Sequence, residues 1–183
     1  MVVFLRHVAL KKSIVVVTTH ISCAWETPVK QLAQVQELLL QLAQIVPPTL
    51  PMILAGDFNS LPGSGAYRLI TERALSMNDA HAFVSSEDQN IGVKLPYQIL
   101  AHEFKLESAY RKIYGKEPMF TNFTAQPRSF SGTLDYVFFS VDRLEVKSVL
   151  ALPSFDYIRK ETALPSSVYP SDHLPLTACF SFK

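Results

Sequence analysis

Apolar and polar positions divide the first third of the chain into two strands, a helix and a third strand. Residues 2–8 and 13–19 are rich in β-branched side chains and are separated by a pair of lysines, which predicts a hairpin with an exposed turn. A threonine–proline pair at 27–28 then marks the start of a helix, which ends at Pro47. Its apolar side chains recur at helical spacing, at Leu32, Val35, Leu39, Leu42 and Val46. The glutamines of this helix are expected to face solvent.

The segment 51–60 is an apolar run that ends in a glycine, an acid and an amide, which predicts a buried strand with polar groups at its end. A helix between the strand that carries His20 and this strand forms a β-α-β unit, in which helices cover an apolar sheet. Because side chains alternate along a strand, Asp57 and Asn59 lie on one face. An ordinary Asx turn, in which these side chains bond nearby backbone N–H groups, is the alternative interpretation.

The rest of the chain is predicted to hold a short helix near 65–72 and several strands. The expected strands are 120–124, 134–140, 144–152 and 174–182. Residues 85–96 are polar and predict a surface loop. The stretches 126–132 and 153–170 are rich in proline and serine and predict loops that form the walls of a cleft.

Composition indicates one globular domain, because 48% of the 183 residues are hydrophobic and only 18% are charged. The formal net charge is +1, so a nucleic acid would have to be held locally or through metal ions. Cys23 and Cys179 lie in apolar stretches without CxxC spacing, which predicts two reduced structural thiols. We find no membrane span or secretory signal, and we expect an intracellular protein, cytoplasmic or nuclear, or mitochondrial if a transit peptide is missing.

Four apolar segments end in ionisable groups, and four such ends can converge on one site. The four motifs are Thr19-His20, Gly56-Asp57-Phe58-Asn59, Leu134-Asp135-Tyr136 and Ser171-Asp172-His173. With these motifs in this order, the chain resembles the endonuclease/exonuclease/phosphatase superfamily. The resemblance is closest to the deadenylase branch, which holds the carbon-catabolite-repressor-type deadenylases, nocturnin and the mitochondrial 2′-phosphodiesterase. The supporting stretches are 104–110, 120–123, 130–136 and 164–173.

The resemblance implies a fold and a domain organisation. The fold is α/β, the C-terminal half of a four-layer α/β/β/α sandwich of the deoxyribonuclease-I type, with a mixed, mostly antiparallel sheet and flanking helices. Residues 1–183 are then the C-terminal part of one domain whose N-terminal half is absent. In the family that half carries an asparagine and a glutamate that is the principal metal ligand, and neither motif occurs here. Glu26 and Glu37 lie in the wrong context to replace the glutamate.

The resemblance also implies a Mg²⁺-dependent 3′-to-5′ exoribonuclease that releases AMP from poly(A), with Mn²⁺ as an alternative ion. Asp57 would activate the attacking water, Asn59 would hold that water or a phosphate oxygen, and His20 would donate to the phosphate. His173 would be a second phosphate-facing imidazole with Asp135 behind it. The metal would be held by Asp172, Asp57 and Asn59. Taken singly, each residue also fits a structural role, such as a turn acid or a hydrogen-bonding histidine.

Substrate contacts follow from the same resemblance. Phe130 lies where relatives place an aromatic ring that stacks on an adenine. Asn122 is a candidate base or ribose contact, or a plain strand amide. Trp25 would line the same pocket, or be buried beside the long helix. The expected partners are poly(A) RNA or an adenine nucleotide, together with the N-terminal half or another protein that covers the sheet, and no membrane.

Two other functions stay open. The chain can be a catalytically incomplete fragment or pseudoenzyme that binds nucleotides, RNA or another protein. Alternatively, it can belong to a phosphodiesterase or phosphatase that acts on 2′-5′ oligoadenylate or a small nucleotide.

Overall fold

A five-stranded mixed sheet carries the strand ends singled out above. The computed structural model describes residues 1–23, 27–76, 79, 100–126 and 129–183. The strands lie in the order β1-β2-β3-β9-β6, and only β2 and β3 are parallel neighbours. Their bounds are β1 Val2–Arg6, β2 Ser13–His20, β3 Met52–Asp57, β9 Asp135–Ser140 and β6 Leu106–Ser108. The predicted hairpin and β-α-β unit are both present.

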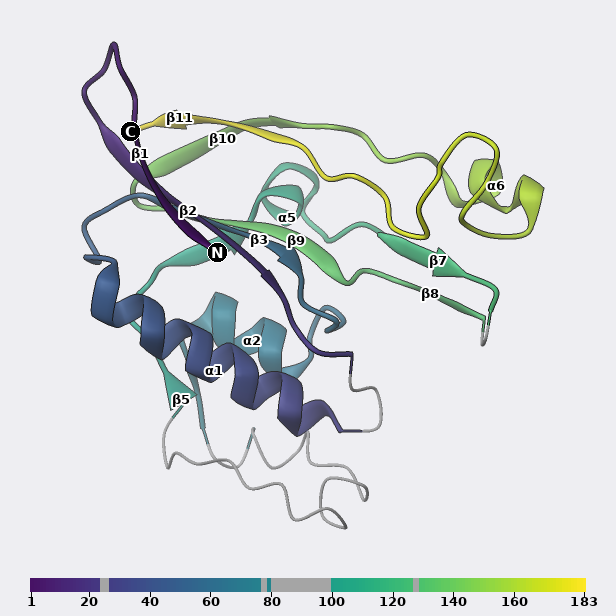
Figure 1. The fold of residues 1–183 in the computed structure, drawn as a ribbon, viewed down its shortest axis with the longest axis horizontal. Helices are drawn as coiled ribbons and strands as arrows, with labels where there is room; N and C mark the ends of the chain where they lie inside the picture. Colours follow the sequence, from purple (N-terminus) through teal and green to yellow (C-terminus); the bar gives the residue numbers. More distant parts are fainter. Residues whose placement is uncertain (24–26, 77–78, 80–99, 127–128) are drawn as a thin grey trace.

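Helices α1 (Pro28–Ile45) and α2 (Gly65–Glu72) cover one face of this sheet, as Figure 1 shows. Their apolar side chains pack on alternate sheet residues such as Val17, Leu54 and Phe138. Both helices lie where the hydrophobic period predicts them. The expectation that the glutamines of α1 face solvent is confirmed for Gln34, Gln41 and Gln44 but is wrong for Gln31 and Gln36, which are buried.

The other face of the sheet packs against helix α5 (Ala109–Tyr114) and a two-stranded antiparallel sheet. The small sheet consists of β10 (Leu144–Val149) and β11 (Ala178–Phe182), and Figure 1 shows it lying across the large one. The fold class is therefore confirmed as an α/β sandwich with a mixed sheet and flanking helices. Cys179 on β11 and Cys23 are both exposed and are not joined in a disulfide, which agrees with the prediction of reduced thiols. Their exposure gives no support to a structural role.

Shorter elements extend from one edge of the sandwich. Strands β7 (Asn122–Thr124) and β8 (Phe130–Gly132) form an antiparallel hairpin, and the segment after β10 contains α6 (Phe155–Ile158) and the 3₁₀ helix η1 (Arg159–Glu161). The stretches 126–132 and 153–170 are thus not simple loops. Strands β4 (Ala74–Leu75) and β5 (Leu100–Ala101) form an antiparallel pair.

Two expectations lie outside the described residues, namely the loop at 85–96 and the position of Trp25. In the described part of the chain, every helix is too short or too polar to cross a lipid bilayer.

Candidate functional site

Sheet register brings the first three polar strand ends together. Strands β2 and β3 run in parallel with His20 beside Asp57, and β9 runs antiparallel to β3 with Asp135 beside Asp57. Gly56 permits this close arrangement. Its φ is +147°, and a Cβ atom there would lie 1.9 Å from the Thr19 carbonyl oxygen. The end of β3 therefore delivers its carboxylate between a histidine and a second carboxylate.

His173 joins this group from a distant part of the chain. Its backbone forms a bridge with Asn122 on β7, and the next residue donates its N–H to the Thr121 carbonyl oxygen. Nδ1 of His173 lies 2.8 Å from Oδ2 of Asp135, the contact expected from the sequence, and Nε2 lies 4.0 Å from Oδ2 of Asp57. A carboxylate can only accept, so Nδ1 carries a proton and donates it to Asp135.

Asp57 is held by Asn59 in an Asx arrangement. Asn59 has a left-handed φ of 48°, and its backbone N–H donates to Oδ1 of Asp57 over 2.8 Å. The side-chain amide of Asn59 is buried and donates to the Ile21 carbonyl oxygen at 2.7 Å and to Oδ2 of Asp57 at 3.3 Å. Both sequence interpretations hold at once: the turn is present, and it places the amide beside the carboxylate.

The two histidines differ in exposure. The His20 side chain is 75% exposed with Nε2 3.4 Å from Oδ2 of Asp57, whereas the His173 side chain is 30% exposed. His20 can thus move toward a ligand. The hydrogen bond from Nδ1 to Asp135 fixes the ring of His173, so that only Nε2 faces the site.

Burial and charge shift two pKa values in this group. Partial burial raises the pKa of Asp57, opposed by the hydrogen bond from Asn59 and reinforced by the nearby charge of Asp135. The hydrogen bond to Asp135 raises the pKa of His173 against the effect of its own burial. A carboxylate that binds its proton more tightly than usual is a stronger base once ionised, and a histidine that stays protonated can donate to an anion.

The carboxylates of Asp57 and Asp135 offer oxygens that fit a divalent cation, whereas His173 could be a ligand only after losing the proton on Nε2. One ligand atom from each of Asp57, Asp135 and His173 lies within 4.8 Å of the others, and carboxylate oxygens are the ligands that Mg²⁺ and Mn²⁺ take in proteins. Asp172 is not part of this cluster. Its Oδ2 lies 3.3 Å from the side-chain amide of Asn122, whose hydrogen bond therefore goes to a carboxylate in this structure.

Phe130 lies on the β7–β8 hairpin against Gly132 and Leu61. A Cβ atom on Gly132 would lie 2.7 Å from the Phe130 ring and 2.8 Å from a methyl group of Leu61. The missing side chain of Gly132 therefore makes room for the ring. Leu61 and Gly132 are neighbours of Phe130 that the sequence analysis did not single out.

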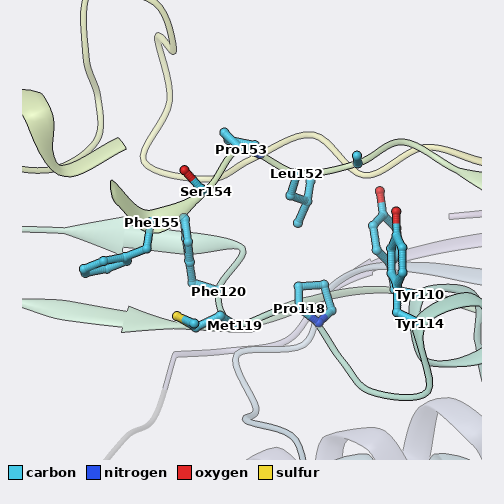
Figure 2. A pocket seen from close by; sticks show the side chains of 10 residues that line it. Tyr110, Tyr114, Pro118, Met119, Phe120, Leu152, Pro153, Ser154 and Phe155 are labelled. Carbon is cyan, nitrogen blue, oxygen red and sulfur yellow. The ribbon is translucent and has the colours of Figure 1, made fainter. Parts of the chain in front are cut away.

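Two hollows differ sharply in chemistry. One of about 210 Å³ is lined by Asp57 and Asp135 together with Gly56, Tyr136 and Leu174. A second of about 320 Å³ lies between α5 and the segment before α6, and Figure 2 shows its lining of tyrosine, proline, methionine and phenylalanine side chains. The Tyr110 hydroxyl there already donates to the Leu150 carbonyl oxygen. Of these two hollows, only the first is lined by carboxylates.

This chain is similar to known proteins in both sequence and fold. A model of the "Endonuclease/Exonuclease/phosphatase family" matches residues 4–173. Carbon catabolite repressor protein 4 homolog 1 of Arabidopsis thaliana is 34% identical over 90% of this chain and 29% of its own length. 2′,5′-Phosphodiesterase 12 of Mus musculus is 32% identical over 94% of this chain and 27% of its own length.

A solved structure extends this likeness to three dimensions. The crystal structure of ANGEL2, described as a 2′,3′-cyclic phosphatase, superposes with a TM-score of 0.72 at 26% identity, over 92% of this chain and 57% of that one. Of the two curated relatives named above, the chain spans less than a third of the length. With its matched motifs, its sandwich and its clustered carboxylates and histidines, the chain belongs to the endonuclease/exonuclease/phosphatase family.

Proposed function

We propose that this chain forms the phosphate-facing part of a metal-dependent 3′-to-5′ exoribonuclease that removes AMP from poly(A) RNA inside the cell. The observation that carries the proposal is the convergence of Asp57, Asp135, His20 and His173 at one sheet edge, with His173 hydrogen-bonded to Asp135 over 2.8 Å. Support comes from the match to Carbon catabolite repressor protein 4 homolog 1 and from a second match, to an Aspergillus clavatus protein named a CCR4-Not complex 3′-5′-exoribonuclease subunit.

The side chains divide the work of hydrolysis. Asp57 accepts a proton from the attacking water, because partial burial makes its ionised carboxylate a better base and Asn59 fixes its direction. His173 donates from Nε2 to a phosphate oxygen, and Asp135 stabilises the imidazolium from behind. His20, exposed at the rim, supplies a second donor. Phe130 stacks on the terminal adenine.

A bound divalent cation would supply a Lewis acid for the phosphate. Asp57, Asn59 and Asp172 are our candidates to hold it, although the residues whose ligand atoms cluster in the structure are Asp57, Asp135 and His173. The rest of the family domain, joined to this chain or supplied by a partner, would contribute the glutamate that these residues lack. We propose that the same segment covers the apolar side chains that β1 exposes, Phe4 and Leu5.

A second substrate class is favoured by two relatives. One is named a 2′,5′-phosphodiesterase and the other a 2′,3′-cyclic phosphatase, so a site of this shape serves linkages at the 2′ oxygen as well. Substrate choice then depends on how the ribose is held rather than on the acid–base groups, because in either case a water molecule attacks a phosphorus atom held beside the same groups.

The test is AMP release from 3′-5′ oligo(A), compared with 2′-5′ oligo(A) and a 2′,3′-cyclic adenylate. The protein assayed is a fusion of this chain with the part of the family domain that this chain does not cover. Activity is measured with Mg²⁺, with Mn²⁺ and with a chelator. Stepwise AMP release from the 3′-5′ substrate that the chelator and Asp57→Ala both abolish supports the proposal. Preferred cleavage of a 2′-linked substrate assigns the second class, and no cleavage of any of them refutes both.

A further inference from the structure

One buried hydroxyl lies directly behind the Asp135–His173 pair. Thr121, the residue before β7, is fully buried, and its Oγ1 lies 2.7 Å from Oδ2 of Asp135. This is the same carboxylate oxygen that accepts the Nδ1–H of His173 over 2.8 Å. The three side chains therefore form a line of two hydrogen bonds that meet on one atom.

The direction of the hydroxyl proton follows from the other contacts of Oγ1. The backbone N–H groups of Leu134 and Asp135 both donate to Oγ1, at 2.9 and 3.0 Å. A hydroxyl oxygen has two lone pairs and one hydrogen, so both acceptor positions are filled. The hydrogen is left to point at Oδ2 of Asp135.

The backbone of Thr121 joins the segments that carry the pair. Its N–H donates to the Gly132 carbonyl oxygen on β8, and its own carbonyl oxygen accepts the N–H of Leu174 over 2.7 Å, next to His173. One residue thus fixes the position of the histidine's segment through its backbone and the carboxylate's rotation through its side chain.

We propose that Thr121 is the positioning residue of the site: its hydroxyl locks the rotation of the Asp135 carboxylate so that His173 keeps one ring orientation, with Nε2 facing the substrate. This proposal deepens the proposed function. Only the expected effect on kcat rests on that function, and the hydrogen-bond arrangement does not. Without the hydroxyl, the two N–H groups lose their acceptor, and Oδ2 of Asp135, which lies 2.7 Å from that hydroxyl in the wild type, is an oxygen that can replace it. The carboxylate would turn toward the backbone and away from His173.

The test compares Thr121→Val, which keeps the shape of the side chain and removes the hydroxyl, with Thr121→Ser, which keeps the hydroxyl. Proton NMR of the chain without substrate reads the pair directly. We expect a slowly exchanging Nδ1–H signal of His173 in the wild type and in Thr121→Ser, and its loss in Thr121→Val. A Thr121→Val protein that folds and keeps this signal overturns the proposal, even if its thermal stability has fallen.

A wild-type measurement covers the case in which Thr121→Val does not fold. The Thr121 hydroxyl proton and the His173 Nδ1–H proton both point at one oxygen, so a through-space cross-peak between them is expected, and its absence overturns the proposal. In the joined enzyme, Thr121→Val should lower kcat about 10- to 100-fold with little change in KM, and Thr121→Ser should restore it. An enzyme with no activity on any substrate refutes the proposed function while leaving the NMR result to decide this one.

Discussion

At the scale of single residues, the site depends on side chains that are held by others. Asp57 accepts from the backbone of Asn59, and Asn59 is itself fixed by the Ile21 carbonyl oxygen. Preorganisation of this kind lets a group act without first being reoriented, which is where much of an enzyme's rate advantage arises. Small changes that preserve shape are therefore the most informative tests.

Asp57→Asn should abolish proton transfer while preserving the turn. The amide oxygen can still accept the N–H of Asn59, which now reaches Oδ1 over 2.8 Å, so the fold should keep its stability. The general base is lost, and we expect kcat of the joined enzyme to fall by about a hundredfold or more. Steady-state kinetics at saturating Mg²⁺, with thermal unfolding as the check on the fold, measures this. A near-normal rate would remove Asp57 from the proton transfer.

Gly132→Ala should displace the Phe130 ring without unfolding the hairpin. The new methyl group would lie 2.7 Å from the far edge of the ring, a flexible part that can move away. If the ring stacks on adenine, losing this contact weakens binding by roughly 1–3 kcal/mol, or about 5- to 150-fold in KM.

Ser131→Ala, at the exposed residue between Phe130 and Gly132, is the matched control and should leave KM unchanged. Fluorescence titration with AMP gives an independent value of the affinity. Equal affinities for Gly132→Ala, Phe130→Ala and the wild type would mean that the ring does not contact the base.

At the scale of elements, helix α1 reaches the site through a buried glutamine. Nε2 of Gln31 donates to the Asn59 carbonyl oxygen, which ties the segment that follows β3 to the helix. Gln31→Met fills a similar volume but leaves that buried carbonyl oxygen without this donor, and we expect a loss of about 1–3 kcal/mol in the free energy of unfolding.

Urea denaturation measures this loss, with Gln41→Met on the exposed face of the same helix as the control. That control should change the free energy of unfolding by less than about 0.5 kcal/mol, because Gln41 is exposed and its side-chain amide donates to Glu37 one turn away. If the two variants are equally stable, the glutamine does not anchor the site.

The sequence predicts the long elements well because their signals are repeated along many residues. Helix α1 has a proline start and an apolar residue every three or four positions, and α2 begins at Gly65 with Ser64 as its cap. Strand β8 has no such signal, since Phe130–Gly132 is short and contains a serine and a glycine. β8 is stabilised by its pairing with β7 rather than by a strand signal in its own residues.

The same reasoning separates the predicted from the missed site residues. Asp57, Asp135 and His173 were found because ionisable groups at the ends of apolar runs are conspicuous. Thr121 was missed, because a threonine before a strand has no distinctive pattern and its role depends on a backbone brought from 13 residues away. Buried Gln31 was missed for a related reason, because an amide side chain is expected at the surface unless its hydrogen-bond partner is known.

At the scale of the whole molecule, a half-buried acid, Glu117, links α2 to the segment after α5. Glu117 accepts from the Tyr67 hydroxyl at 2.7 Å and from the Ser108 hydroxyl at 2.9 Å. Burial raises the pKa of Glu117, and burial together with this carboxylate raises the pKa of Tyr67 to about 12. An acid whose pKa is raised by folding stabilises the fold below its ordinary pKa of 4.5, and this contribution is lost as pH rises through the folded value.

Glu117→Gln should therefore become more stable relative to the wild type as pH rises from about 4 to about 7, because the amide cannot ionise. Denaturation across this range gives the difference in the free energy of unfolding. Glu103→Gln removes the same charge from an exposed position and is the control. A difference that stays constant with pH, or that runs the other way, would show that Glu117 does not ionise at a cost in the fold.

We expect the activity to need more of the family domain than this chain covers. This chain covers 57% of the ANGEL2 chain and leaves Phe4 and Leu5 of β1 about half exposed, at 56% and 48%. Mg²⁺ gives up its water reluctantly and needs a near-octahedral set of oxygens, which the clustered Asp57, Asp135 and His173 do not complete.

Residues 1–183 alone should consequently release little or no AMP from oligo(A) with Mg²⁺, while the family segment that they do not cover should restore release, whether fused or added in trans. That segment would supply both a further carboxylate and a cover for the exposed apolar side chains, so the same addition should raise Mg²⁺ affinity in calorimetry and the temperature of unfolding together. Asp57→Ala controls for a contaminating nuclease. Robust release by residues 1–183 that disappears in Asp57→Ala would mean that these residues complete the metal site themselves, and the proposed dependence on a further segment would be wrong.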